Sequence, residues 1–85
     1  MNIKFTNKAE KQYAKLPKNL KEKARKQFHF LLDDYRHHSL RTRKMAGSLY
    51  FEARIDKHNR FTFEIIDDDI FVRSIGPHDE GLGKK

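Results

Sequence analysis

Arginines and carboxylates alternate with apolar residues between positions 52 and 73, and a histidine follows at position 78. Such a set suits cleavage of RNA by its own 2′-hydroxyl. That reaction needs a base, cations that hold the phosphorane charge and an acid for the leaving 5′-oxygen. Arg54 and Arg60 could bind a phosphate through their planar guanidinium groups. Histidine titrates near neutrality, so His78 could be the acid. The residue types therefore predict phosphodiester chemistry that requires no metal ion.

Each of these side chains also has a structural interpretation, which the sequence alone leaves open. Arg54 and Arg60 could form cross-strand ion pairs with Glu52 and Asp56. His78 could be a surface or capping histidine. The choice between the two interpretations depends on which residues face each other in the folded chain.

Hydrophobic periodicity predicts the elements that must position these groups. Residues 2–5 alternate as a short strand, and Asn7 with Glu10 three residues later has capping-box spacing that opens a helix. A second helix is predicted over residues 18–36, and Phe30 falls on its exposed face. The apolar residues of its buried face recur at helical spacing: Leu20, Ala24, Phe28, Leu31, Leu32 and Tyr35.

From residue 49 onward the apolar period changes from that of a helix to that of a strand. Residues 49–55 and 60–65 are predicted to pair as a hairpin with Ile55 opposite Phe61, because both apolar sets then share one face. The loop of this hairpin is expected at residues 57–59.

The predicted register has a consequence for the face of the sheet that is turned away from the helices. It places Asp56 opposite Arg60, and Glu52 opposite Glu64 in a like-charge pair that nearby arginines should neutralise. The polar residues expected together on this face are Glu52, Arg54, Arg60, Thr62, Glu64 and Arg73. The sequence shows no aromatic–basic ladder of the kind that stacks on single-stranded nucleic acid.

A last strand is predicted over residues 70–75, after an acidic turn at residues 67–69. The aspartates of this turn are interpreted as turn residues rather than metal ligands, and neither a metal nor a cofactor is expected. The fold class is α+β, with the order β-α-α-β-β-β and a helical hairpin packed on one face of a small, mostly antiparallel sheet. Residues 1–80 are expected to form a single domain, and residues 81–85 a flexible tail.

Charge is distributed unevenly along the 85 residues. Nineteen Lys and Arg against twelve Asp and Glu give a net charge of +7, and residues 1–47 alone carry thirteen basic and four acidic residues. So basic a segment suggests a nucleic acid, an anionic membrane surface or an acidic protein as partner, with a merely solvated surface as the alternative. The stretch Arg41, Arg43 and Lys44 is expected to hold phosphates if RNA binds. Phe30, an aromatic on a basic helix face, is expected to dock a partner protein.

The sequence also bears on where the protein acts. Cysteine is absent, and no apolar run approaches the roughly 18 residues that a membrane span needs. Because small secreted domains usually depend on disulfides, a cytoplasmic protein without a membrane partner is expected.

The segment from Leu49 to Glu80 gives the chain a resemblance to the RelE/ParE superfamily of type II toxins. It reads Leu-Tyr-Phe-Glu-Ala-Arg-Ile-Asp-Lys-His-Asn-Arg, then an aromatic strand, an acidic turn and Ile-Gly-Pro-His-Asp. Those toxins have the same β-α-α-β-β-β order, and the resemblance spans nearly the whole chain. It looks closest to the branches of YoeB and YafQ, which keep a histidine after the last strand.

The resemblance implies a ribosome-dependent messenger-RNA endoribonuclease that inhibits translation and is held inactive by a cognate antitoxin. By position, Arg60 matches a phosphate-stabilising arginine, Arg54 a second arginine that contacts RNA, and His78 the general acid. Lys44 matches a basic residue before the second strand. The basic helices would contact the RNA of the small ribosomal subunit.

Two departures from the family pattern bear on the chemistry. The glutamate that acts as base in the YoeB-like branch falls at Arg41, and Asp79 stands where an aromatic residue, often tyrosine, would complete the site. Glu52, on the same face as Arg54, is expected to replace the missing base. The alternative functions are a gyrase inhibitor of the ParE type and a catalytically inactive homologue that binds an antitoxin.

Overall fold

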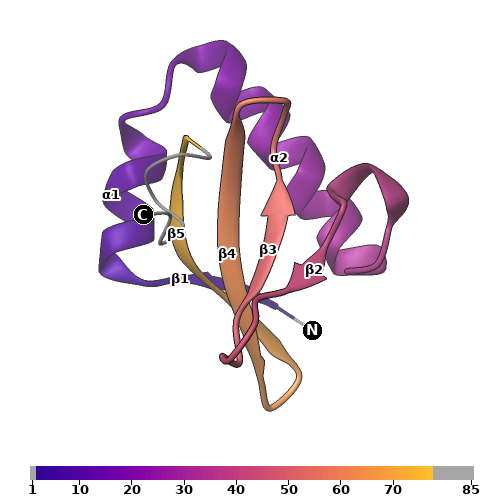
Figure 1. Cartoon of the computed structure of the whole chain (residues 1–85). Coiled ribbons are helices and arrows are strands. Elements are labelled where there is room, and N and C mark those ends of the chain that lie inside the picture. The colour runs from indigo at the N-terminus through magenta and orange to yellow at the C-terminus, as the bar shows by residue number, and fades with distance from the viewer. Residues whose placement is uncertain (1, 78–85) are drawn as a thin grey trace.

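Two helices and a five-stranded sheet make up the computed structural model, which describes residues 2–77 (Figure 1). The elements are β1 Ile3–Phe5, α1 Asn7–Ala14, α2 Lys18–Asp33, the 3-10 turn η1 His38–Leu40, β2 Arg43–Lys44, β3 Phe51–Arg54, β4 Asn59–Ile66 and β5 Asp69–Pro77. The predicted α+β class is confirmed. The sequence pattern did not predict β2, which is only two residues long.

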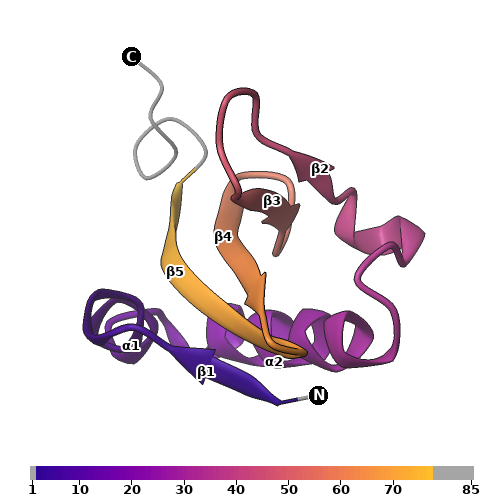
Figure 2. The same ribbon diagram turned by 90° about the horizontal axis from the view of Figure 1, so that it is seen from below.

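The strands lie side by side in the order β1-β5-β4-β3-β2. β1 is parallel to β5, and the other neighbouring strands are antiparallel. Figure 2 shows both helices on the same side of β4 and β5, as the prediction of a helical hairpin on one face requires. None of the helices within residues 2–77 is long and apolar enough to cross a membrane.

The helices form where the periodicity predicts them, with two corrections at their ends. Thr6, not Asn7, caps α1, because its Oγ1 accepts a hydrogen bond from the Ala9 N–H at 3.2 Å. Helix α2 ends at Asp33, three residues earlier than predicted, because Asp34 has an extended backbone conformation.

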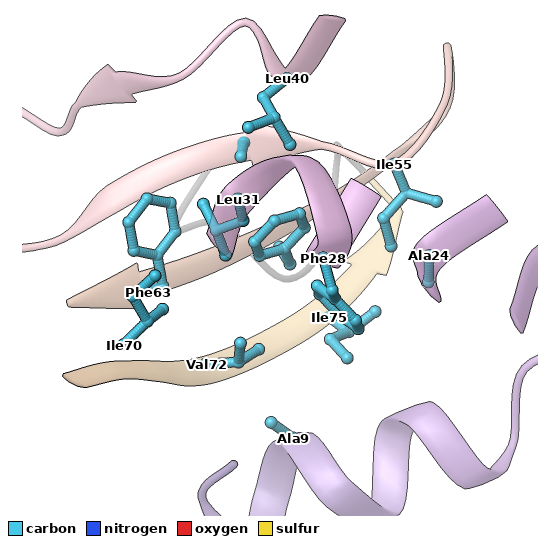
Figure 3. Packing of buried hydrophobic residues seen from close by; sticks show 12 residues of the cluster. Ala9, Ala24, Phe28, Leu31, Leu40, Ile55, Phe63, Ile70, Val72 and Ile75 are labelled. Atoms are coloured by element: carbon cyan, nitrogen blue, oxygen red, sulfur yellow. The ribbon is translucent and has the colours of Figure 1, made fainter. Parts of the chain in front are cut away.

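The hydrophobic core lies between the helices and the sheet (Figure 3). Phe61 and Phe63 are fully buried, and the Phe61 ring packs edge-on against Phe28 with centroids 5.1 Å apart. Leu32, predicted to be buried, is 40% exposed, whereas Gln27 is buried on the same helix. The Gln27 amide is tolerated there because it donates hydrogen bonds to carbonyls of η1 and β3 at 3.1 and 2.8 Å.

β3 and β4 pair in a register two residues away from the predicted one. Ala53, rather than Ile55, is opposite Phe61, and the loop comprises residues 55–58 rather than 57–59. Because side chains alternate between the two faces of a strand, a shift of two residues leaves every side chain on its predicted face. The structure therefore differs from the prediction in the cross-strand partner of each side chain, but not in which side chains share a face.

The shift changes which charges face each other. Glu52 is opposite Thr62 instead of Glu64, so the predicted repulsion between two carboxylates is absent. Arg60 is opposite Arg54 instead of a carboxylate. The sheet thus places two cations, rather than two anions, directly against each other.

The acidic turn between β4 and β5 is confirmed. Asp67 and Asp68 have positive φ angles of 49° and 71°, as a two-residue hairpin turn requires. Asp69 begins β5, where the Asn2 N–H and the Lys4 ammonium lower the pKa of its carboxyl. No group of three potential metal ligands is found among the residues that the structure describes.

Candidate functional site

Side chains that alternate with the core residues of β3, β4 and β5 point away from the helices and form a surface that we call the open face. It carries Glu52, Arg54, Arg60, Thr62, Glu64, Phe71, Arg73 and Ser74. The six polar residues predicted for this face all lie on it. Arg73 is the extra residue of a bulge in β5, and its Nη1 lies 3.2 Å from Oε1 of Glu64.

Arg54 and Arg60 are directly opposed on neighbouring strands, an arrangement that costs free energy unless another group compensates the charges. Nη1 of Arg60 donates to the backbone carbonyls of Asp56, Asn59 and Lys57 at 2.8, 3.2 and 3.3 Å. Neither arginine forms an ion pair with a carboxylate of residues 2–77. The interpretation of both arginines as partners of Glu52 and Asp56 is therefore wrong, since Asp56 offers Arg60 its carbonyl and not its carboxylate.

The loop that holds Arg60 is itself organised by the Asp56 carboxylate. Oδ1 of Asp56 accepts hydrogen bonds from the N–H groups of His58 and Asn59, both at 2.9 Å, and from the Asn59 amide at 3.1 Å. Nζ of Lys23 in α2 lies 3.8 Å from Oδ2. Burial opposes ionisation of this carboxyl, but the hydrogen bonds and the lysine outweigh burial and lower the pKa of Asp56.

Asp56→Ala is expected to destabilise the protein by about 1–2 kcal/mol near pH 7, because it removes a charged acceptor that serves three donors in one loop. The unfolded carboxyl has an ordinary pKa of about 4, above that of the folded carboxyl. The stabilisation is therefore complete above that value and is lost as the pH falls through the folded pKa. Urea unfolding at neutral and acidic pH should show a difference between variant and wild type that shrinks toward acid.

Glu22→Ala provides the control for this measurement. Glu22 is an exposed carboxylate without an ion pair among the described residues. A difference between Asp56→Ala and wild type that stays constant from neutral to acidic pH would contradict the role given to the Asp56 carboxylate.

Glu52 lies in the row next to the two arginines, two residues along β3 from Arg54 or roughly 7 Å. Its side chain is only 6% exposed, and Oε1 accepts a hydrogen bond from Nε of Arg43 at 2.8 Å. In the same row the hydroxyl groups of Thr62 and Ser74 are hydrogen-bonded at 2.7 Å. The carboxylate expected to act as base is thus on the open face beside the arginines, positioned by Arg43.

The structure separates the members of the basic stretch at residues 41–44. Arg43 is opposite Glu52, whereas Lys44 is opposite Phe51, whose ring belongs to the core side. Arg41 is exposed at the end of η1, with a positive φ of 49°. Of the three, Arg43 is the residue that strand pairing brings to the open face.

Phe30 is half-buried rather than exposed, which corrects the expectation from the helix pattern. Its ring stacks on the His37 imidazole with centroids 4.0 Å apart, and His37 stacks on His38 at 4.8 Å. The chain after α2 therefore covers one face of the Phe30 ring. Helical periodicity could not indicate this contact, because both histidines lie beyond the end of the helix.

His78, expected to be the general acid, and Asp79 lie outside the described residues. The last described residue is Pro77, which is paired with Asn59. Asn59 is the residue before Arg60, so β5 ends beside the arginine pair. The position of His78 directly after Pro77 is given by the sequence alone.

Comparison with known proteins gives the same fold in a set of solved structures, although no family model and no curated protein matches the sequence. The YoeB/ParE toxin from Agrobacterium tumefaciens has a TM-score of 0.81 at 15% identity, over 92% of this chain and 99% of that chain. A chain of the E. coli RelBE toxin–antitoxin complex has a TM-score of 0.73 at 23% identity, over 88% and 93%. A chain of the Staphylococcus aureus YoeB–YefM complex has a TM-score of 0.78 at 19% identity, over 92% and 97%. These likenesses confirm the fold that the sequence resemblance implied.

Proposed function

We propose that this protein, which has the fold of the RelE and YoeB toxins, is the toxin of a type II toxin–antitoxin system. In this proposal it is an endoribonuclease that cleaves messenger RNA on the ribosome. Translation in the cytoplasm is inhibited as a result. The resemblance of residues 49–80 to these toxins and the agreement in fold both support the proposal.

The observation that carries the proposal is the opposed pair of Arg54 and Arg60. These two guanidinium groups lie on adjacent strands and have no carboxylate partner in residues 2–77. An anion bound between them would compensate both charges. Arg60 is anchored by backbone carbonyls, which orient its guanidinium without neutralising its charge. A phosphate that gains negative charge in the transition state is such an anion.

The proposed reaction is attack of the 2′-oxygen on the adjacent phosphorus. A bond from phosphorus to the 2′-oxygen forms as the bond to the 5′-oxygen breaks, which leaves a 2′,3′-cyclic phosphate and a free 5′-hydroxyl. Glu52 takes the proton of the 2′-hydroxyl, and His78 gives a proton to the leaving 5′-oxygen. Arg60 stabilises the charge of the phosphorane, and Arg54 holds the phosphate in place. No step of this reaction requires a metal ion or a cofactor.

The remaining basic residues are assigned to binding. Arg41, Arg43, Lys44 and Arg73 hold the phosphates that flank the cleaved bond. The two helices present further cations to the RNA of the small ribosomal subunit, and their exposed lysines are Lys8, Lys11, Lys18, Lys23 and Lys26.

We also infer a cognate antitoxin, because the RelBE and YoeB–YefM structures are toxin–antitoxin complexes. An acidic, partly helical segment would complement the basic helices. A cavity of about 310 Å³ between β1 and the helices offers a place for an apolar anchor of such a segment. Its lining consists of Phe5, Glu10, Tyr13, Arg25 and Phe28. Phe30, which is partly buried in the last turn of α2, stays a predicted contact of the antitoxin.

Primer extension on a messenger tests the proposed function. The protein is added to translating ribosomes and, separately, to the same RNA without ribosomes. Cuts inside the translated region that appear only with ribosomes are the expected result, and a protein with alanine at positions 54 and 60 is the control. Intact messenger together with arrested DNA replication on expression would instead indicate a gyrase inhibitor.

A further inference from the structure

A second group of open-face side chains crosses the sheet at the end away from the two arginines. Lys4 of β1 is paired with Phe71 of β5, and its Nζ lies 5.6 Å from the centre of the Phe71 ring. The guanidinium of Arg73 lies 4.9 Å from the centre of the Tyr50 ring. Cations and aromatic rings thus alternate across the sheet, and we call these four residues the aromatic–cation row.

Carboxylates hold the cations of this row over the rings. Glu64, which is opposite Phe71 in the register, lies 3.2 Å from Nη1 of Arg73. Oδ2 of Asp69, at the start of β5, lies 3.3 Å from Nζ of Lys4. The bulge in β5 gives Arg73 the extra position from which it reaches Tyr50. Both rings are half-buried, so part of each stays in contact with solvent.

The aromatic–cation row shares the open face with Arg54 and Arg60. Tyr50 and Arg54 are four residues apart at β3, which corresponds to roughly 13 Å along an extended chain. The row of Glu52, Thr62 and Ser74 lies between them. A strand of RNA whose phosphate rests on the arginines reaches the aromatic–cation row within a few nucleotides.

We propose that the aromatic–cation row binds unpaired nucleobases of the messenger beside the cleaved phosphate, with the bases stacked on Tyr50 and Phe71. This inference rests on the proposed nuclease function and adds a recognition subsite to it. Lys4 and Arg73 each have one carboxylate partner, so an acidic peptide, which has only charge to offer this row, would find that charge partly compensated. A cation lies over one face of each ring, so the part of each ring that stays in contact with solvent is what this row still offers to a stacking nucleobase.

The protein concentration that gives half-maximal cleavage on translating ribosomes tests the subsite. Tyr50→Leu keeps an apolar side chain but removes the ring, and we expect this concentration to rise roughly tenfold. The cleavage rate at saturation should change much less, because a contact away from the reacting bond contributes to binding. Tyr50→Phe, which restores the ring, should bring the concentration back to within roughly twofold of wild type. Leu49→Ala is the matched control, because Leu49 is 75% exposed beside the row.

The outcomes separate this inference from the function on which it rests. If Tyr50→Leu cleaves with the half-maximal concentration of wild type, the subsite is overturned while the nuclease stands. The subsite is also overturned if Tyr50→Phe raises the half-maximal concentration as much as Tyr50→Leu does, because loss of ring stacking then does not explain the effect. Absence of cleavage by the wild-type protein overturns the nuclease itself. Thermal unfolding verifies each variant, and Phe71→Leu carries the same expectation at the second ring should Tyr50→Leu fail to fold.

Discussion

Replacing Arg60 with alanine should lower the maximal rate of messenger cleavage by about 100- to 1000-fold, the usual cost of removing one group that stabilises transition-state charge. Arg60 is held by three backbone carbonyls of its own hairpin, so its guanidinium is oriented before the substrate arrives. Protein stability should change little, because the loss of these hydrogen bonds is offset by removal of the opposition between the two cations Arg54 and Arg60. Single-turnover cleavage and thermal unfolding of both proteins measure the two effects.

Two further variants make the test of Arg60 specific. Arg60→Lys keeps the charge but loses the planar fork that binds two phosphate oxygens, so it should recover only part of the rate. Lys57→Ala removes an exposed cation from the same loop and leaves the carbonyl that Arg60 uses, so it should cleave like wild type. Normal cleavage by Arg60→Ala would refute the assignment of Arg60 to the transition state.

Glu52→Gln should lower the cleavage rate by at least about 100-fold, because the amide has the shape of the carboxylate but cannot accept the 2′-hydroxyl proton. The buried position of Glu52 and its contact with Arg43 keep the side chain in one orientation. The amide oxygen can still accept the hydrogen bond from Arg43, so the fold should be retained. Single-turnover cleavage, with binding to the ribosome measured in parallel, separates a lost base from lost affinity.

Two companion variants distinguish a base from a structural carboxylate. Arg43→Gln removes the ion-pair partner and a phosphate contact but keeps the Glu52 carboxylate that accepts the proton, so at saturating protein it should lower the rate less than Glu52→Gln does. Added formate should restore part of the activity of Glu52→Ala, because a small carboxylate can enter the space left by the side chain. If Glu52→Gln cleaves at the rate of wild type, Glu52 is not the base and only positions Arg43.

Local pattern predicted most of the fold because it records which face of each element is buried. Alternation along residues 60–65 puts Phe61 and Phe63 on the buried face and Thr62 on the open face, and the structure agrees. The helix pattern failed at Leu32, which is 40% exposed, and it did not indicate Gln27, which is buried. An amide is buried there because two backbone carbonyls accept its hydrogen bonds, and no periodicity of apolar residues can indicate such partners. Strand β2 was not predicted because a strand of two residues is too short to show an alternation of apolar and polar residues.

The candidate site was predicted as a set of residues but not as an arrangement. Arg54, Arg60 and Glu52 were placed on one face by their spacing alone, since alternation in a strand survives a shift of two residues. Their cross-strand partners were predicted wrongly, because the register of β3 and β4 depends on the conformation of the loop at residues 55–58 that joins them. The Asp56 carboxylate closes it with three hydrogen bonds and thereby sets Arg60 against Arg54.

The sequence by itself determined the fold class, the buried faces and the types of residue available for chemistry, because these follow from local periodicity and composition. Only the tertiary structure decided that two arginines oppose each other without carboxylate partners in the described chain. It alone also brought Lys4, Tyr50, Phe71 and Arg73 into one row, where the sequence showed no aromatic–basic ladder. These side chains come from segments far apart in the chain, and strand pairing and a bulge, which act across the sheet, fix their contacts.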